Sequence, residues 1–195
     1  MTGIKTRYKE FLRDRRGFAA IELAFIAPVL LLIYFGVADL SDWYMKHRRL
    51  VVAGSTIADL VTQNPGQVTG QEINNFWTGI GLIIEPMPLD SLVLTIRDYR
   101  KEGGSSKRQW VYPAAPSSSS TPPPPRCGDE RNAQQLLDLA SNEMTDANDI
   151  LIAEVCTTIE PMVLQVFGFE PVPMRYYISM RPRLGKTLDC TAGCS

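Results

Sequence analysis

Few residues in this chain have the types and spacing that catalysis requires. The 195-residue sequence holds one histidine, His47, and four cysteines, Cys127, Cys156, Cys190 and Cys194. A single histidine disfavours most metal sites and the nucleophiles that depend on an imidazole base. Cys190 and Cys194 are also spaced more widely than the cysteines of thioredoxin-like motifs. We therefore expect no enzymatic activity, no metal ion and no cofactor.

The cysteines are expected to form disulfides, because their number is even and all lie well beyond a long apolar run. A helix predicted over Asp129–Met144 and a strand starting at Ile150 would bring Cys156 back near Cys127. This geometry favours a Cys127–Cys156 bond and leaves Cys190–Cys194 as a small terminal loop. Two other pairings stay open. Asp146 and Asp149, between that helix and strand, are interpreted as solvated turn residues in preference to calcium ligands.

Charge is distributed unevenly along the chain. The segment Met1–Gly17 holds six Lys or Arg residues against two acidic ones, whereas the net charge of the whole chain is −1. The remaining residues are therefore mildly acidic. Nucleic-acid-binding domains usually present a basic face, so we expect no nucleic-acid partner.

A membrane-spanning helix is predicted directly after this basic segment. The stretch Phe18–Leu40 meets the length of about 20 apolar residues that a crossing needs. Between Leu23 and Val37 there is no charged residue, and ten Leu, Ile, Phe or Val residues contribute roughly −3 to −6 kcal/mol to insertion. The residues expected to lie within the membrane, one proline among them, are Leu23, Phe25, Ile26, Pro28, Leu30, Leu31, Leu32, Ile33 and Phe35.

The flanking charges predict the orientation of this helix. More Lys and Arg residues precede the apolar run than follow it closely, and the positive-inside rule then places the N-terminus in the cytoplasm. We expect a single-pass protein of a bacterial inner membrane with its C-terminal domain in the periplasm.

The start of the helix combines three features: a basic leader that ends in Gly17, an apolar Phe18, and an acidic Glu22 at the edge of the span. This combination resembles the processing site of type IV prepilins, and most closely the TadE-like minor pilins of the tight-adherence (Tad, Flp) pilus. Further matching features are Ala24–Pro28, Leu30–Leu32, Gly36, the basic turn Lys46–Arg49, and the small residues Ala53, Gly54 and Ala58.

The resemblance implies a role in pilus assembly, adherence and biofilm formation. By resemblance, a prepilin peptidase would cleave after Gly17, and Phe18 would become the mature N-terminus. Glu22 would pair with the free amine of a neighbouring subunit and set the register of assembly. The implied partners are the membrane, other pilins or pseudopilins, and the Tad secretion machinery.

Two other interpretations of the N-terminal segment stay open. One is an uncleaved signal anchor that carries a periplasmic scaffold or binding domain. The other is a secretory signal peptide with a small-residue cleavage site at Gly36–Ala38. Neither accounts for the acidic residue at its position after the glycine.

The helix is predicted to continue beyond the membrane. An apolar stripe formed by Leu50, Ala53, Ile57, Leu60 and Val61 indicates packing against a domain, and Asn64-Pro65-Gly66 ends the helix. A helix over Phe18–Gln63 would be about 69 Å long. The predicted organisation is a leader at 1–17, a membrane helix at 18–40, a periplasmic extension at 41–63, and a domain at 64–195 with a Pro/Ser-rich loop at 113–126.

The domain is predicted to be α+β with an antiparallel sheet. The expected elements are a helix at Gln71–Ile80, an extended connector at Glu85–Pro88, and strands at Leu92–Tyr99, Arg108–Tyr112, Ile150–Ile159 and Tyr176–Met180. The first two strands are interpreted as a hairpin with a loop longer than two residues. The apolar third strand is expected to be central, and Pro182 would end the last strand or place it at an edge.

Overall fold

The computed structural model describes residues 18–114, 148–161 and 170–195, together with Gln135, Leu137, Asp138, Gln165 and Gly168. Several predictions fall outside these residues. They concern the leader with Gly17, the Pro/Ser-rich loop beyond Ala114, Cys127, most of the helix predicted over Asp129–Met144, and Asp146.

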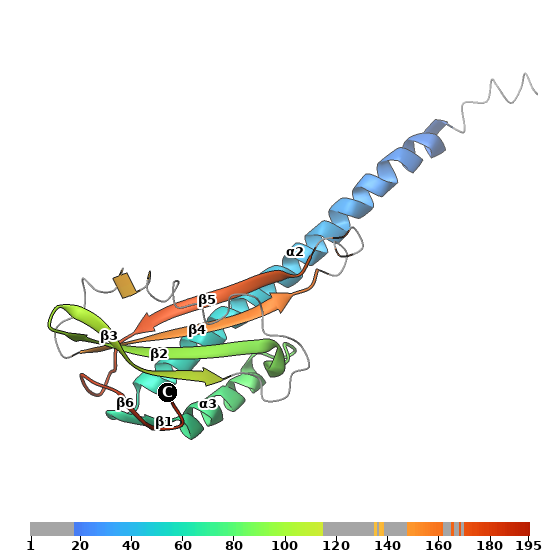
Figure 1. Ribbon diagram of the computed structural model, residues 1–195. Coiled ribbons are helices and arrows are strands. Elements are labelled where there is room, and N and C mark those ends of the chain that lie inside the picture. The colour runs from blue at the N-terminus through green and yellow to red at the C-terminus, as the bar shows by residue number, and fades with distance from the viewer. Residues whose placement is uncertain are drawn as a thin grey trace, which may run out of the picture.

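One long helix, α2, forms the axis of the molecule. It covers Phe18–Thr62, 45 residues, which corresponds to about 67 Å. The helix continues through Pro28, as the sequence predicts for Phe18–Gln63. Figure 1 shows its N-terminal half projecting away from the domain and its C-terminal half lying along the sheet.

Four antiparallel strands form the main sheet in the order β3-β2-β4-β5. Their bounds are β2 Leu92–Glu102, β3 Ser105–Ala114, β4 Asp149–Ile159 and β5 Val172–Met180. The α+β class, the central position of β4 and the edge position of β5 are therefore confirmed. The apolar residues of β4 are buried on both faces, which is why this strand lies inside the sheet.

The core lies between one face of the sheet and the C-terminal half of α2. The helix lies over β4 and β5. A stripe of its residues shares one core cluster with alternate residues of β2 and β4: Leu50, Ala53, Ile57, Ala58 and Val61 of the helix, and Leu94, Ile96, Ala153 and Val155 of the strands. All nine side chains are at 0 % exposure, so four of the five residues predicted for the inward face, Leu50, Ala53, Ile57 and Val61, are confirmed. The fifth, Leu60, is only half-buried and lies outside this core cluster, whereas Ala58 belongs to it.

The opposite face of the sheet is buried as well. Tyr99, Ile150, Ile152 and Leu137 form a second apolar cluster there. Beside it, Arg97 Nη1 donates to Glu154 Oε2 at 3.1 Å, and the Tyr177 hydroxyl donates to the other oxygen of Glu154 at 3.0 Å. This buried ion pair keeps both of its charges compensated.

The turn between β2 and β3 corrects the sequence prediction. Both strands extend further than expected, so that Glu102 pairs with Ser105 and only Gly103-Gly104 connects them. The two glycines have φ of 59° and 86°. A two-residue hairpin turn with positive φ at both positions favours glycine, so the loop is not longer than two residues.

Smaller elements close the far end of the domain, opposite the projecting helix (Figure 1). Helix α3, Gly70–Ile83, begins with a capping box in which Thr69 and Glu72 each accept from the other's backbone N–H. Strand β1, Gln67–Thr69, pairs in parallel with β6, Asp189–Ala192. The sequence patterns did not predict this strand pair. A short 3₁₀ helix, η2, lies at Leu89–Ser91, directly before β2.

Helix α2 lies close to the sheet at Gly54. A Cβ atom there would lie 2.6 Å from Cδ1 of Tyr176 on β5. We expect Gly54→Ala to lower the free energy of unfolding by about 1–3 kcal/mol because of this overlap. The gain of up to about 1 kcal/mol in helix propensity would offset only part of the loss.

The matched control is Gly79→Ala on α3, where a Cβ would meet nothing within 4 Å. This variant should be neutral or more stable than wild type. Thermal unfolding of the detergent-solubilised chain, followed by near-ultraviolet circular dichroism, measures both. Equal melting temperatures for the two variants would contradict the close packing of α2 on β5.

Candidate membrane and assembly interface

The N-terminal half of α2 presents an apolar surface that the rest of the molecule leaves uncovered. No residue from Ile21 to Leu40 is buried, and exposed fractions reach 77 % at Phe25. Within the described part of the chain, one helix is long and apolar enough to cross a membrane, and its most apolar window has a mean hydropathy of 2.3. A core helix of a water-soluble domain would be mostly buried, so this half of α2 fits a single-pass membrane helix.

The structure places the predicted membrane residues as follows. Leu23, Phe25, Ile26, Leu30, Leu31, Leu32, Ile33 and Phe35 are all exposed around this part of the helix. Because they surround the helix on every side, contact with lipid or with neighbouring membrane helices can cover them. Glu22 is exposed among them and lies one helical turn after Phe18, the first described residue of α2. Gly17, on the other side of the predicted cleavage site, lies outside the described residues.

Polar and aromatic side chains mark the end of the apolar surface. Trp43 stacks on His47 with ring centroids 5.7 Å apart, and Lys46 forms an ion pair with Asp42 at 2.6 Å. Aromatic rings with a polar edge and basic side chains are favoured at the level of lipid headgroups. This turn of α2 is therefore suited to the membrane surface.

A cluster of charged residues lies on the helix-facing side of the sheet, toward β6. Arg100 donates to the two carboxylate oxygens of Asp149 from Nε and Nη2, at 2.6 and 2.9 Å, and Nη2 also donates to Asp189 at 3.0 Å. Asp149 additionally accepts from the backbone N–H of Leu188 at 2.6 Å. These contacts hold the C-terminal segment against the sheet.

The prediction that Asp149 is a solvated turn residue is therefore wrong. Asp149 is at 0 % exposure and stands opposite Arg100 in the register of β2 and β4. The strand begins at Asp149 itself, so its side chain belongs to the sheet and makes a cross-strand charge pair. The spacing of Asp98 and Arg100 on one strand was the only signal in the sequence for this cluster.

Asp98 completes the cluster, and its pKa is raised well above that of a free aspartate. It is fully buried, and neither carboxyl oxygen accepts a hydrogen bond from the residues described. Burial, followed by the nearby Asp149 carboxylate, raises the pKa of Asp98 from 3.8 to about 9, although Arg100 opposes the shift. Three carboxyl groups share one guanidinium in this cluster, so the neutral form of Asp98 avoids an uncompensated buried charge.

The cysteines occupy two places. Cys190 and Cys194 form a disulfide at the C-terminal end of the chain, with their Cα atoms 6.1 Å apart. Cys156 is also disulfide-bonded and is fully buried on β4. Cys127 lies outside the described residues, so the favoured Cys127–Cys156 pairing stays a prediction. Within the described residues, no group of three or more His, Cys, Asp or Glu side chains is placed to hold a metal ion.

The state of Asp98 predicts how stability depends on pH. Its pKa is higher in the folded chain than in the unfolded chain, so folding retains a proton between about pH 4 and pH 9. The stability that this group contributes is fully present below about pH 4 and is lost as the pH rises through about 9. Asp98→Asn cannot ionise, and we expect it to flatten this part of the pH profile.

Urea unfolding at pH 5, 7 and 9 measures the effect. The wild-type free energy of unfolding should fall over this range by at least about 1 kcal/mol more than that of Asp98→Asn. Asp90→Asn, at an exposed position of η2, should keep the wild-type slope. If Asp98→Asn and wild type have parallel profiles, Asp98 is not protonated in the folded chain.

The comparisons with known proteins agree with this division of the molecule. Residues 17–59 match the family described as TadE-like protein. No curated protein and no solved structure matches the chain. The match covers the membrane helix and most of its continuation into the core, and it includes Gly17, Glu22, Gly36 and Gly54. It confirms the resemblance expected from the sequence, in that residues 17–59 are similar to TadE-like proteins.

Proposed function

We propose that this protein is a minor pilin or pseudopilin-like subunit that supports assembly of a Tad (Flp) pilus, and through it adherence and biofilm formation. The observation that carries the proposal is the division of α2 within a TadE-like segment. Residues Leu23–Val37 are uncharged and none of them is buried, whereas a stripe between Leu50 and Val61 is part of the core of the domain. Such a helix can hold a folded domain at a membrane and still offer its first half to neighbouring helices.

In this proposal the protein sits in the bacterial inner membrane, with its N-terminus in the cytoplasm and its domain in the periplasm. The basic residues of the leader favour the cytoplasmic side. The Cys190–Cys194 disulfide is consistent with an oxidising compartment for the domain. The role is structural, and the domain carries out no reaction.

Glu22 is the residue on which assembly would depend. A carboxylate at the edge of a membrane helix is unfavourable unless it finds a partner of opposite charge. Cleavage after Gly17 by a prepilin peptidase would create an ammonium group at Phe18, four residues before Glu22. In a bundle of such helices, the amine of one subunit can pair with the carboxylate of the next and offset the cost of burying both.

Processing is tested by N-terminal sequencing of the protein purified from a host with its own pilus system. We expect a mature chain that begins at Phe18. Gly17→Ala should abolish the conversion, and Gly3→Ala, within the same leader, should leave it intact. An unprocessed N-terminus would favour the alternative function, a membrane-anchored periplasmic scaffold. A chain that starts at Asp39 would point to a secretory signal peptide.

Assembly is tested by complementing a strain that lacks the gene and counting pili per cell. Wild type should restore piliation. Glu22→Ala should be processed normally but reduce pili at least 10-fold, because the Phe18 ammonium loses its partner. Glu102→Ala, an exposed acidic residue at the end of β2, is the control and should behave as wild type. Full piliation with Glu22→Ala would contradict the assigned role of Glu22.

A further inference from the structure

Two grooves follow one another along α2 where the helix meets the domain. The first, which we call the apolar groove, is lined by Gly36, Leu40 and Trp43 of α2 and by Ile159, Pro161 and Val172 of the domain, with Asp39, Asp42 and Glu170 at its wall. The second, the charged groove, lies further along the helix and contains Asp42, Lys46, Arg49 and Glu160. Asp42, Ile159 and Pro161 line both, so the grooves are continuous.

The dimensions of this continuous groove fit a membrane lipid. Gly36 and Arg49 are about 20 Å apart along the helix, close to half of the roughly 40–45 Å thickness of a bilayer with its headgroups. The charged and apolar parts have volumes of about 500 and 450 Å³, within the range of small-molecule sites. A Cβ at Gly36 would meet nothing within 4 Å, so the helix leaves the apolar groove open there.

The order of chemistry along the groove also matches a lipid. The apolar part lies beside the last turns of the membrane helix, and the charged part lies beyond them. In an α-helix the Cα–Cβ bonds tilt toward the N-terminus, so the side chains of Lys46 and Arg49 leave α2 in the direction of the membrane. The ion pair between Lys46 and Asp42, one turn earlier, confirms this direction for Lys46.

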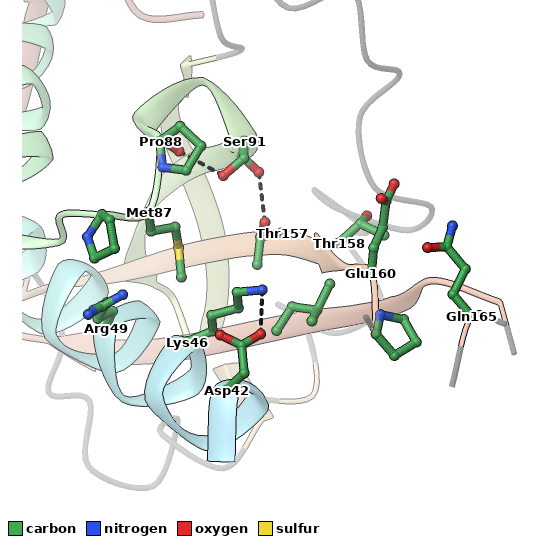
Figure 2. A pocket seen from close by; sticks show the side chains of 13 residues that line it. Asp42, Lys46, Arg49, Met87, Pro88, Ser91, Thr157, Thr158, Glu160 and Gln165 are labelled. Atoms are coloured by element: carbon green, nitrogen blue, oxygen red, sulfur yellow. Dashed lines mark hydrogen bonds and ion pairs between the residues drawn. The ribbon is translucent and has the colours of Figure 1, made fainter. Parts of the chain in front are cut away.

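Two charged side chains of the groove form no ion pair or hydrogen bond within the described part of the molecule. Figure 2 shows Lys46 paired with Asp42 in the middle, Arg49 on the side of the Met87–Pro88 connector, and Glu160 beyond Thr158 on the opposite side. Arg49 is half-buried, and neither it nor Glu160 has a hydrogen-bond or ion-pair partner among the residues described. A cation and an anion therefore remain for a ligand.

We propose that this groove binds one zwitterionic phospholipid of the surrounding membrane. Its phosphate lies at Arg49, its primary ammonium lies at Glu160, and an acyl chain follows the apolar groove past Trp43 to Gly36. The four carboxylates of the groove, Asp39, Asp42, Glu160 and Glu170, outnumber Lys46 and Arg49. This balance disfavours a headgroup with a net negative charge. The inference depends on the membrane crossing and not on leader cleavage or pilus assembly.

The test measures lipid retained by the full chain in detergent, by native mass spectrometry after addition of a defined lipid. The probes are phosphatidylethanolamine, phosphatidylcholine and phosphatidylglycerol. Wild type should retain one molecule of phosphatidylethanolamine at least 10-fold more than phosphatidylglycerol. Phosphatidylcholine should be retained less well, because its quaternary ammonium cannot donate a hydrogen bond to Glu160.

The variants separate the parts of the site. Arg49→Gln should lower retention of phosphatidylethanolamine about 10-fold, and Gly36→Leu should lower it by filling the apolar groove. Glu160→Gln should remove the preference over phosphatidylcholine. The controls Arg48→Gln and Glu85→Gln change exposed residues that do not line either groove.

Three results would overturn the proposal. One is equal retention of the three lipids, and another is a preference for phosphatidylglycerol. The third is the absence of bound lipid together with disulfide cross-linking of Arg49→Cys to a second copy, which would make the groove a protein contact. Because each readout uses purified protein, a failure of lipid binding leaves leader processing and piliation as independent questions.

Discussion

The whole structure depends on one uninterrupted helix that has to satisfy two environments. The first half of α2 is apolar around its circumference and is uncovered from Ile21 to Leu40. Its second half is apolar along one stripe, which packs against β4 and β5. The hydrophobic effect acts on both halves, but lipid or neighbouring helices can cover the first, whereas the sheet and α3 cover the second.

Polar contacts hold the C-terminal segment and β6 against the main sheet, where burial of apolar side chains alone would not fix their position. Arg100 joins β2 to β4 and β6 through Asp149 and Asp189, and Trp110 donates to the Leu188 carbonyl at 2.7 Å. At the C-terminus, the backbone groups of Ser195 and Val111 bond to each other at 2.7 and 2.9 Å, which covers part of the free edge of β3. The end of the domain farthest from the projecting helix is therefore held by directional bonds.

The two halves of α2 meet at the point where the membrane helix joins the folded domain. There the helix leaves its uncovered stretch, the ends of β4 and β5 approach it, and Trp43, Lys46 and His47 accumulate within about two turns. Residues that line the grooves come from three separate parts of the chain. Because segments of the domain contact α2 at this point, the depth of the helix in the membrane also sets the height of the domain above the membrane.

The sequence by itself determined the features that depend on local periodicity. An unbroken apolar run specified the membrane helix, the Leu50–Val61 stripe specified its continuation into the core, and the apolar strand from Ile150 specified the centre of the sheet. The short motif from Gly17 to Glu22 was sufficient to indicate the TadE-like segment. Tertiary structure alone decided the rest, because it depends on contacts between distant residues. The burial of Asp149 required Arg100 on another strand, the parallel pair β1–β6 joined segments from opposite ends of the domain sequence, and the groove at Arg49 and Glu160 formed only when β4 reached the helix.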